Sequence, residues 1–504
     1  MTDPGDPSFE ERLERHRRFD VHLNEETRPP ESEVITLHSV TIAEMYVSQD
    51  VDKLVSELRS LHWDEGAGVA DSVAEALKGD LFSGGRFWIY NISASQASGL
   101  GGSAYAPMPE ETERIFASYE VLGPSLAAMV FTFVLSTSDS MKLDAALRED
   151  AQSTLTPVGG GMLRYERVRE AKKARLRKVR SDLEDRYRTW ISAHFQGSLC
   201  STDKGVGLPS ALLISLEDGL PFETHAQYMT LLDLYNSALA MRLAEYNSVF
   251  LTYPLDASPN NRTVAAFNRS KAEGENWLPG LGEPPETFHE TYSAALVADG
   301  VRAVLTSYFR KLRGVRHALV RINLNSASSG DALVKLRDQL IDSSRDISAV
   351  TGDVEVLLDD PFAIWTEIPD LVSVAAAGSP TQVISSVDSK KRDLAANISE
   401  LRKDEANLRQ LVLVSSESAS EKSGHSIQQG LLVLTQKLNT LTSLLLVLTV
   451  VLVVLGVAAL LVQWFHEPSV MVHTPSEHLR SGHLPVTPGT AGGQTTTTSS
   501  SLVK

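Results

Sequence analysis

The alternation of apolar and polar positions over the first half of the chain predicts a folded α+β domain. Residues 34–47 and 126–135 are β-branched and apolar enough for buried strands. Between them, residues 51–63 repeat apolar side chains at helical spacing. The same patterns predict further strands at residues 86–92, 208–216 and 248–253, and further helices at residues 164–191 and 227–246. We therefore expect an α+β fold with a small mixed sheet and several helices in residues 31–260.

Composition and pattern divide the rest of the chain. Residues 1–30 are charged and punctuated by proline, which predicts a flexible N-terminus. Residues 261–286 are rich in Pro, Gly and Asn and predict a loop, after which residues 287–380 become wholly helical. Residues 465–504 are rich in Thr, Ser, Gly and Pro, so we expect a disordered tail.

Residues 381–440 predict a long stalk helix with a coiled-coil seam. A heptad stripe, with members exactly one heptad apart, consists of Val387, Leu394, Leu401 and Leu408. A second run, the seam, steps by four and three residues, which is coiled-coil spacing, and consists of Ile427, Leu431, Leu434, Leu438, Leu441 and Leu445. An isolated apolar stripe must bury itself, so we expect a homo-oligomer. The alternative is that the stripe packs back on the chain's own domain.

Residues 441–464 predict a single transmembrane helix. This segment has 24 residues and no charge, enough to cross a hydrocarbon core of roughly 30 Å. A helix also satisfies its own backbone hydrogen bonds in lipid; a buried core helix is the alternative. The polar N-terminus predicts no signal peptide. Together with the flanking Lys and Arg residues, this favours a single-pass cell-membrane protein with its large N-terminal domain in the cytoplasm and membrane lipid as a partner.

Charge excludes one class of partner and marks one surface. The net charge of −17 argues against nucleic-acid binding, because an acidic chain repels phosphate. Residues 164–188 nevertheless hold eleven Lys or Arg against five acidic residues. This run predicts either a solvated helix face or a basic surface for anionic lipid or an acidic partner. The candidate basic surface consists of Arg164, Arg167, Lys172, Lys173, Arg175 and Lys178.

Motifs that carry chemistry are missing from the sequence. It contains no GxxxxGK[ST], HExxH, CxxC or GxSxG motif. The single cysteine, Cys200, permits no intramolecular disulfide, and an idle thiol is the default interpretation. Four histidines in the tail have spacings that match no tight ligand pattern: His466, His473, His478 and His483. We therefore predict no enzyme and no cofactor, and the sequence assigns no metal.

The order of these parts resembles the CorA-type divalent-cation channels. The resemblance is carried by the β–α start at residues 34–63 and by the seam that runs through residues 437–442 (KLNTLT) into the apolar segment. In that family such stalks assemble as pentamers around a central pore. The resemblance therefore implies an oligomer with a CorA-like cytoplasmic domain. The family's Gly-Met-Asn loop and second membrane helix have no counterpart here, so no selectivity residue is carried over.

Two functions of different classes follow from this pattern. The leading hypothesis is a single-pass oligomeric membrane protein with a CorA-like cytoplasmic domain, which acts as a channel-like or membrane-effector element. The alternative is a membrane-tethered scaffold or ligand-sensing module without ion conduction. A membrane-anchored enzyme would require a cofactor site or a cleft of convergent titratable groups, which the sequence does not display.

Overall fold

The computed structural model describes the chain from residue 9 to residue 424, with gaps. The described residues are 9–63, 71, 86–94, 104–157, 163–201, 207–235, 241–244, 246, 248–252, 262–274, 283–322, 329–360, 364–374 and 383–424. The chain divides into two compact units, Met1–His425 and Ser426–Lys504. The predicted seam, transmembrane helix and tail (residues 427–504) lie outside the described residues.

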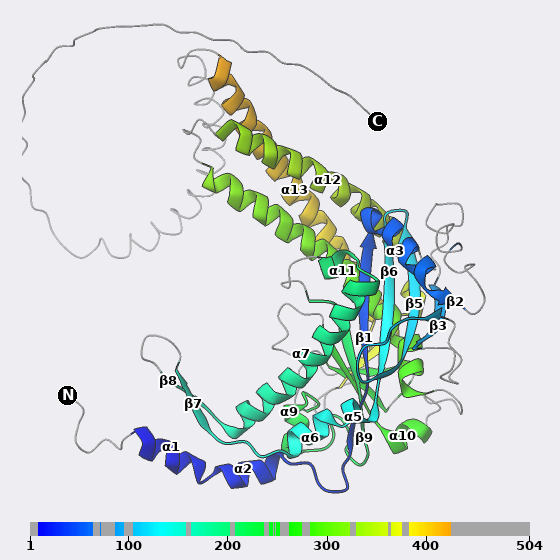
Figure 1. The fold of residues 1–504 in the computed structure, drawn as a ribbon, viewed down its shortest axis with the longest axis vertical. Coiled ribbons are helices and arrows are strands. Elements are labelled where there is room, and N and C mark those ends of the chain that lie inside the picture. The colour runs from blue at the N-terminus through cyan, green and yellow to red at the C-terminus, as the bar shows by residue number, and fades with distance from the viewer. Residues whose placement is uncertain are drawn as a thin grey trace, which may run out of the picture. The chain divides into compact units, whose positions relative to one another are not determined.

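A mixed sheet of twelve strands forms the centre of the described unit (Figure 1). Its strand order is β14-β13-β10-β11-β12-β9-β1-β6-β5-β3-β4-β2. The strands are β1 (Ile35–Val47), β2 (His62–Trp63), β3 (Arg86–Ser93), β4 (Ala104–Tyr105), β5 (Thr112–Gly123), β6 (Leu126–Leu135), β9 (Ser210–Leu216), β10 (Met241–Leu243), β11 (Val249–Thr252), β12 (Arg262–Asn268), β13 (Leu371–Ser373) and β14 (Val383–Ile384). A separate hairpin pairs β7 (Thr154–Pro157) with β8 (Leu163–Glu166).

Helices precede, interrupt and follow the strands. The shorter ones are α1 (Phe9–Arg17), α2 (Asp20–Thr27), α3 (Ser48–Ser60), α5 (Thr137–Ser140), α6 (Lys142–Arg148), α8 (Ser198–Ser201), α9 (Gln227–Leu231), α10 (Arg269–Gly274) and the 3-10 helix η2 (Ile364–Glu367). The long ones are α7 (Val168–His194), α11 (Pro284–Arg321), α12 (Ser329–Asp359) and α13 (Ser386–Gly424).

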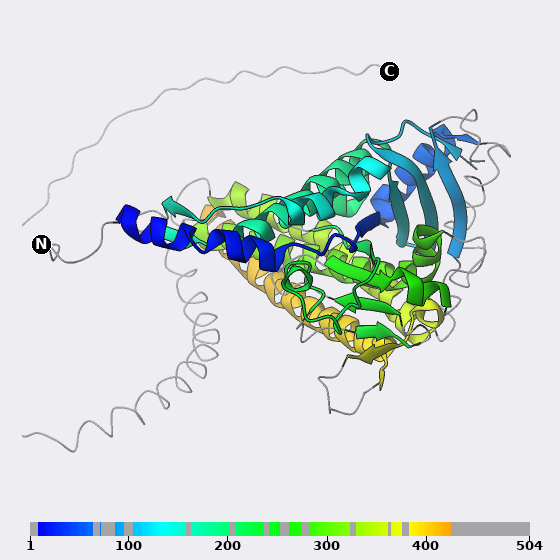
Figure 2. The same ribbon diagram turned by 90° about the horizontal axis from the view of Figure 1, so that it is seen from below.

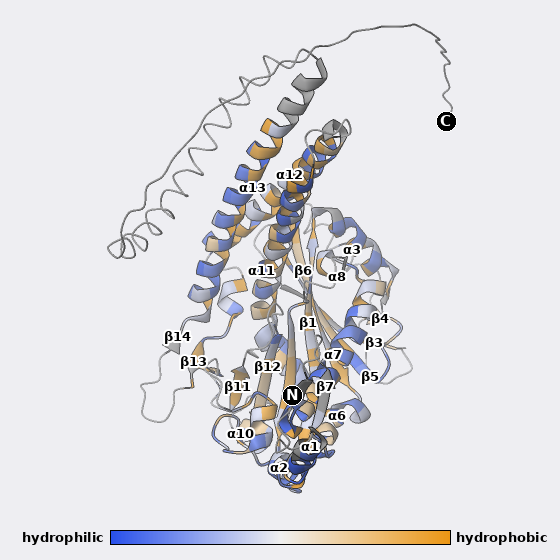
Figure 3. Cartoon of the chain, turned by 90° about the vertical axis from the view of Figure 1, so that its left-hand side faces the viewer, coloured by the Kyte–Doolittle hydropathy of each residue, from blue (hydrophilic) through white to orange (hydrophobic). Residues whose placement is uncertain are grey.

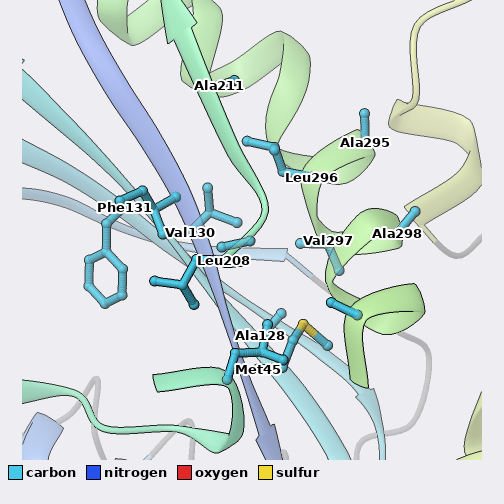
Figure 4. Close-up of a cluster of buried hydrophobic side chains, with 14 of the residues drawn as sticks. Met45, Ala128, Val130, Phe131, Leu208, Ala211, Ala295, Leu296, Val297 and Ala298 are labelled. Carbon is cyan, nitrogen blue, oxygen red and sulfur yellow. The ribbon is translucent and has the colours of Figure 1, made fainter. Parts of the chain in front are cut away.

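Strand β1 lies in the interior of the sheet, because it pairs antiparallel with β6 on one side and β9 on the other. Its side chains alternate between two covered faces. On one face Met45 packs against α11, where a β-carbon on Gly300 would lie 2.5 Å from the Met45 sulfur. On the other face the Tyr46 hydroxyl donates a 2.7 Å hydrogen bond to the carbonyl of Phe195, just after α7. Figure 4 shows the apolar layer between the sheet and α11. Both faces of β1 are therefore buried.

Helices α11, α12 and α13 pack side by side and extend away from the sheet (Figures 1 and 3). We call these three helices the bundle. Helices α11 and α13 run in the same direction, since Asp299 meets Lys390 and Arg316 meets Asp404 further along both helices. Helix α12 runs antiparallel to them. The predicted α+β class is confirmed in this part of the chain. The region expected to be wholly helical, residues 287–380, contains the long helices α11 and α12 but also strand β13.

Several predictions about the sheet are wrong. The sheet is large, because its last strands come from residues 262–384 and not only from residues 31–260. The loop expected at residues 261–286 contains β12, whose short apolar run lies between β9 and β11. Strand β5 went unpredicted, because polar residues such as Ser118 and Glu120 interrupt its apolar run although both are buried.

The helix expected over residues 227–246 is also wrong. Helix α9 covers only Gln227–Leu231, and Met241–Leu243 form β10. Asp233 adopts a positive φ of 64°, and the amide of Leu234 bonds the carbonyl of Met229, which turns the chain out of the helix. Apolar spacing alone did not reveal this turn.

The N-terminus is ordered from residue 9, although residues 1–30 were expected to be flexible. Helices α1 and α2 form the dark blue rod in Figure 2. The Asn24 side chain exchanges two hydrogen bonds with the backbone of Ala151, at 2.8 and 2.9 Å. Asp20 accepts hydrogen bonds from the amide and the hydroxyl of Ser153, both at 2.7 Å. These buried polar contacts attach α2 to residues 151–153. The composition of residues 1–30 did not predict them.

Candidate functional site

Helix α13 is fastened to its two neighbours by charged contacts along its length. Near its start, the Lys390 ammonium lies 2.6 Å from the Asp299 carboxylate on α11. Further along, both Arg402 guanidinium ends contact Glu355 on α12, with one contact at 2.8 Å. Because both neighbouring helices are engaged, α13 is fixed in rotation as well as in position.

Apolar packing fixes α13 in the same place. The buried apolar positions of α13 follow the three- and four-residue spacing of a helix face. They are Leu394, Ile398, Leu401, Leu408 and Val412. The heptad stripe is therefore buried inside the chain, with Val387 partly buried at its start. Of the two interpretations of this stripe, the structure supports packing on the chain's own domain, and the seam at residues 427–445 lies outside the described residues.

The start of α13 is tied to the edge of the sheet. Strand β14 ends at Ile384 and pairs antiparallel with β13. Helix α13 begins two residues later, and the Ser386 hydroxyl donates a 2.7 Å hydrogen bond to the carbonyl of Pro369. The neighbouring Lys391 donates to the carbonyl of Leu358 at the end of α12, at 2.9 Å. These contacts join the start of α13 to the edge of the sheet and to the end of α12.

A shallow groove lies near the opposite end of the bundle, between α11 and α13. Its volume is about 530 Å³, and its lining residues are Arg316, Leu319, Val320, Ile322, Asn407, Leu408, Leu411 and Ser415. Val320 is 79 % exposed and Leu411 is 41 % exposed. Large exposed aliphatic side chains of this kind mark an interaction surface more often than a catalytic cleft.

Half of the candidate basic surface on α7 contacts other parts of the protein, namely Lys172, Lys173 and Arg175. Lys172 is buried, and its ammonium donates a 2.7 Å hydrogen bond to the carbonyl of Leu147 at the C-terminal end of α6. Arg175 donates to the carbonyls of Ala146 and Glu149 beside it. Cations at a helix C-terminus satisfy its free carbonyls and offset its dipole. Burial lowers the pKa of Lys172 to about 8.

The remaining members of the candidate surface have different surroundings. Lys173 pairs with Asp233 at 3.0 Å, and Arg180, one of the neighbouring basic residues on α7, contacts the same carboxylate at 3.4 Å. Arg167 and Lys178 are exposed, and Arg164 belongs to β8. The sequence left open whether these cations form a basic surface or a solvated helix face, and the buried Lys172 belongs to neither. The cations instead hold α6 and the segment after α9 against α7.

The buried carboxylate of Glu44 organises the turn around Cys200. It accepts hydrogen bonds from the amides of Leu199 and Cys200, at 2.7 and 3.0 Å. Burial raises the pKa of Glu44 to about 7, although these hydrogen bonds oppose the rise. Burial also raises the pKa of the Cys200 thiol well above its usual range. A raised pKa disfavours the thiolate, which is the nucleophilic form of cysteine.

No cluster of His, Cys, Asp and Glu side chains in the part of the chain that the structure describes is arranged to hold a metal ion. Within the same residues, no helix combines the length and the apolar character that crossing a bilayer requires.

The polar contacts that fix α13 went unpredicted by sequence reasoning. The available signal was a charge within an apolar helical run, since Asp299 interrupts the sequence SAALVADGVRAVL. A carboxylate at such a position requires a cationic partner when it is buried. The sequence could therefore have predicted a partner for Asp299, though not that Lys390 is that partner.

Comparison with known proteins does not assign a function to the chain. No family model matches the sequence, and no curated protein matches it either. Among solved structures, the chain is similar to the cytoplasmic domain of ZntB from Vibrio parahaemolyticus RIMD 2210633, at 13 % identity and a TM-score of 0.21. The match covers 42 % of this chain and 87 % of that one. At this TM-score the similarity assigns no function, and the proposals below rest on the chain's own residues.

Proposed function

We propose that the chain is a single-pass, homo-oligomeric membrane protein whose cytoplasmic α+β domain controls a channel-like or membrane-effector element. The observation that carries this proposal is helix α13. It is one helix of 39 residues, which corresponds to roughly 58 Å, and it starts two residues after the sheet-edge strand β14. In sequence, only residues 425–440 separate it from the uncharged segment 441–464.

The contacts of α13 support an effector in preference to a plain anchor. A tether needs only a flexible connection, whereas α13 is packed and ion-paired against both α11 and α12. Packed elements move as rigid bodies between discrete arrangements. A displacement of β13 and β14, for example on binding of a ligand to the sheet domain, would therefore reach Gly424 as a displacement of the whole helix.

The membrane anchor is tested first, in the full chain. Replacement of both Leu452 and Leu455 by Arg places two charges in the middle of segment 441–464, and each costs about 2.5–3.5 kcal/mol at a helix centre. We expect the native chain to stay in the membrane pellet after alkaline carbonate extraction and the double variant to be released. The control is Val356→Arg, at an exposed position of α12, which should stay in the pellet. Release of the native chain by carbonate would refute the anchor.

Self-association and conduction are tested on purified protein in detergent and in planar bilayers. Chemical cross-linking that yields only monomer contradicts the oligomer. One observation favours a second candidate, a membrane-tethered scaffold or ligand-sensing module without conduction: the heptad stripe is already buried within the chain. An oligomer that passes no current with any cation tested would support this second candidate. Neither candidate requires an enzyme activity or a cofactor.

A further inference from the structure

The second half of α11 is strongly basic within an acidic chain. Residues 300–330 contain six Lys or Arg and no Asp or Glu, although the whole chain carries a net charge of −17. All six cations belong to α11: Arg302, Arg310, Lys311, Arg313, Arg316 and Arg321. Such a local reversal of charge marks a surface for an anionic partner.

Helical spacing brings three of these arginines to one outward face. Arg310, Arg313 and Arg321 follow one another at steps that return to the same side of a helix, with His317 between them. Arg313 and Arg321 are exposed and Arg310 is partly exposed. We call these three arginines the basic stripe; it extends over roughly 16 Å of helix. The opposite side of α11 packs into the bundle through Leu312, Val315 and Leu319.

The basic stripe is available to an external partner, unlike the cations of α7. Within the described part of the chain, Arg310, Arg313 and Arg321 form no ion pair, whereas the neighbouring Arg316 lies 3.4 Å from the Asp404 carboxylate. Lys311 has a separate contact, with its ammonium 5.0 Å from the centre of the Tyr308 ring. The stripe therefore keeps its charge uncompensated.

Exposed aliphatic side chains adjoin the basic stripe. Val320 directly precedes Arg321 and is 79 % exposed, and with Leu411 of α13 it lines the groove described above. Cations beside exposed aliphatic groups, on a helix face, fit the interface of a lipid bilayer. The cations meet the phosphates of the head groups, while the aliphatic groups enter the boundary of the acyl chains.

We propose that the basic stripe, with Val320 and Leu411, binds the surface of an anionic lipid bilayer. This inference rests on the proposed function, because it requires the chain to be held at a membrane. An anionic leaflet attracts each nearby Lys or Arg enough that three of them together change affinity on the order of 100-fold. The contact would orient the bundle against the bilayer and make that orientation dependent on lipid charge and salt.

The test uses the full chain in two kinds of lipid nanodisc, one of phosphatidylcholine alone and one that also contains phosphatidylserine. Hydrogen exchange of the amides in residues 309–322 is measured in both. We expect exchange slower by about 10- to 100-fold in the anionic discs, because lipid binding stabilises the closed helix. Added salt should remove much of the difference.

Two triple variants separate the stripe from general charge. Arg310→Gln, Arg313→Gln and Arg321→Gln together should abolish the difference between the two discs. The matched control removes three exposed cations elsewhere, through Lys178→Gln, Arg269→Gln and Arg392→Gln, and should keep it. Exchange of the β1 amides, equally slow in all proteins, checks that each variant is folded.

Each other outcome overturns a definite statement. A chain that enters both discs but shows equal exchange in residues 309–322 overturns the lipid contact and leaves the proposed function standing. Equal slowing in both discs relative to detergent overturns the role of lipid charge. Slowing that depends on protein concentration instead of lipid assigns the surface to a second copy of the chain, and so overturns the inference. A chain that enters neither disc overturns the proposed function itself.

Discussion

The carboxylate of Asp353 on α12 accepts a 2.6 Å hydrogen bond from the backbone amide of Ser125, in the turn between β5 and β6. This contact joins the bundle to the sheet at a second place, distant in sequence from the start of α13. It also requires a glycine at the end of β5. A β-carbon on Gly123 would lie 2.4 Å from Cγ of Asp353, which is closer than two such atoms can approach.

Replacement of Gly123 by Ala should therefore weaken the fold. We expect the free energy of unfolding to fall by about 1–3 kcal/mol, because α12 or the turn must shift to admit the methyl group. The control is Gly352→Ala, one residue from Asp353, where a β-carbon would meet open space. That change should raise stability by about 0.5–1 kcal/mol, because alanine favours helix. Thermal unfolding followed by circular dichroism measures both, and an equal effect of the two changes would contradict the close approach.

The Lys390–Asp299 ion pair should contribute strongly to the attachment of α13, because little of either side chain is exposed. Lys390→Met leaves the Asp299 carboxylate without this cation, and we expect a loss of about 3–5 kcal/mol. Adding Asp299→Asn to the same chain removes the carboxylate charge that Lys390 neutralised and should restore part of the loss. Urea unfolding of the native, single and double variants measures the coupling. Additive effects of the two changes would argue against it.

The basic residues of α7 should differ sharply in their effect on stability. Lys172→Met removes the buried donor to the Leu147 carbonyl, which costs about 1–3 kcal/mol. Lys178→Met, on the exposed side of the same helix, should change stability by less than about 0.5 kcal/mol. The melting temperatures of the two variants make the comparison. If both changes are neutral, the basic run is a solvated surface after all.

Stability should depend on pH through Glu44. Burial raises the folded pKa of this carboxyl to about 7, above its ordinary value of 4.5, so the folded state holds the proton more tightly than the unfolded chain. Its stabilising contribution is complete below pH 4.5 and is lost as the pH rises to about 7. Glu44→Gln should flatten this change, by up to about 3 kcal/mol. Burial also raises the pKa of Glu57 to about 7, so a smaller slope should remain.

Unfolding free energies at a series of pH values test this prediction. The native chain should lose stability between pH 4.5 and 7, and the Glu44→Gln variant should lose less. A variant with the same slope as the native chain would show that Glu44 does not titrate in this range. His38 acts in the opposite sense, because burial lowers its pKa to about 4, so protonation below pH 6.5 costs stability.

Periodicity predicted the elements whose pattern is continuous and failed where polar residues are buried. Strand β6 was predicted because its apolar run is almost unbroken, and β1 because apolar and β-branched side chains outnumber its polar ones. Strand β5 was missed because its charged and hydroxyl side chains are buried by sheet partners that no local pattern reveals. Strand β12 was missed because proline- and asparagine-rich flanks hide a short apolar run.

Charge clustering in the sequence also could not distinguish cations that form internal contacts from cations that face solvent. The run on α7 is denser, but its partners are backbone carbonyls and Asp233, which lie 25 or more residues away in sequence. The sparser run on α11 keeps its arginines outward because the opposite face of that helix fills the bundle. Which of two basic runs faces solvent depends on tertiary contacts, and these are absent from a linear pattern.

The order of strands in the sheet has a consequence for synthesis of the chain. Strand β10, at residues 241–243, pairs with β13, at residues 371–373, so its outer edge stays open until well over a hundred further residues have been made. Strand β14 and helix α13 come later still. On the ribosome, the nascent domain therefore presents an unpaired strand edge for a long interval, which invites pairing with other chains. Completion of the fold and emergence of the apolar segment 441–464 then follow closely in time. A chaperone that binds exposed strand edges would therefore have to dissociate at about the moment of membrane targeting.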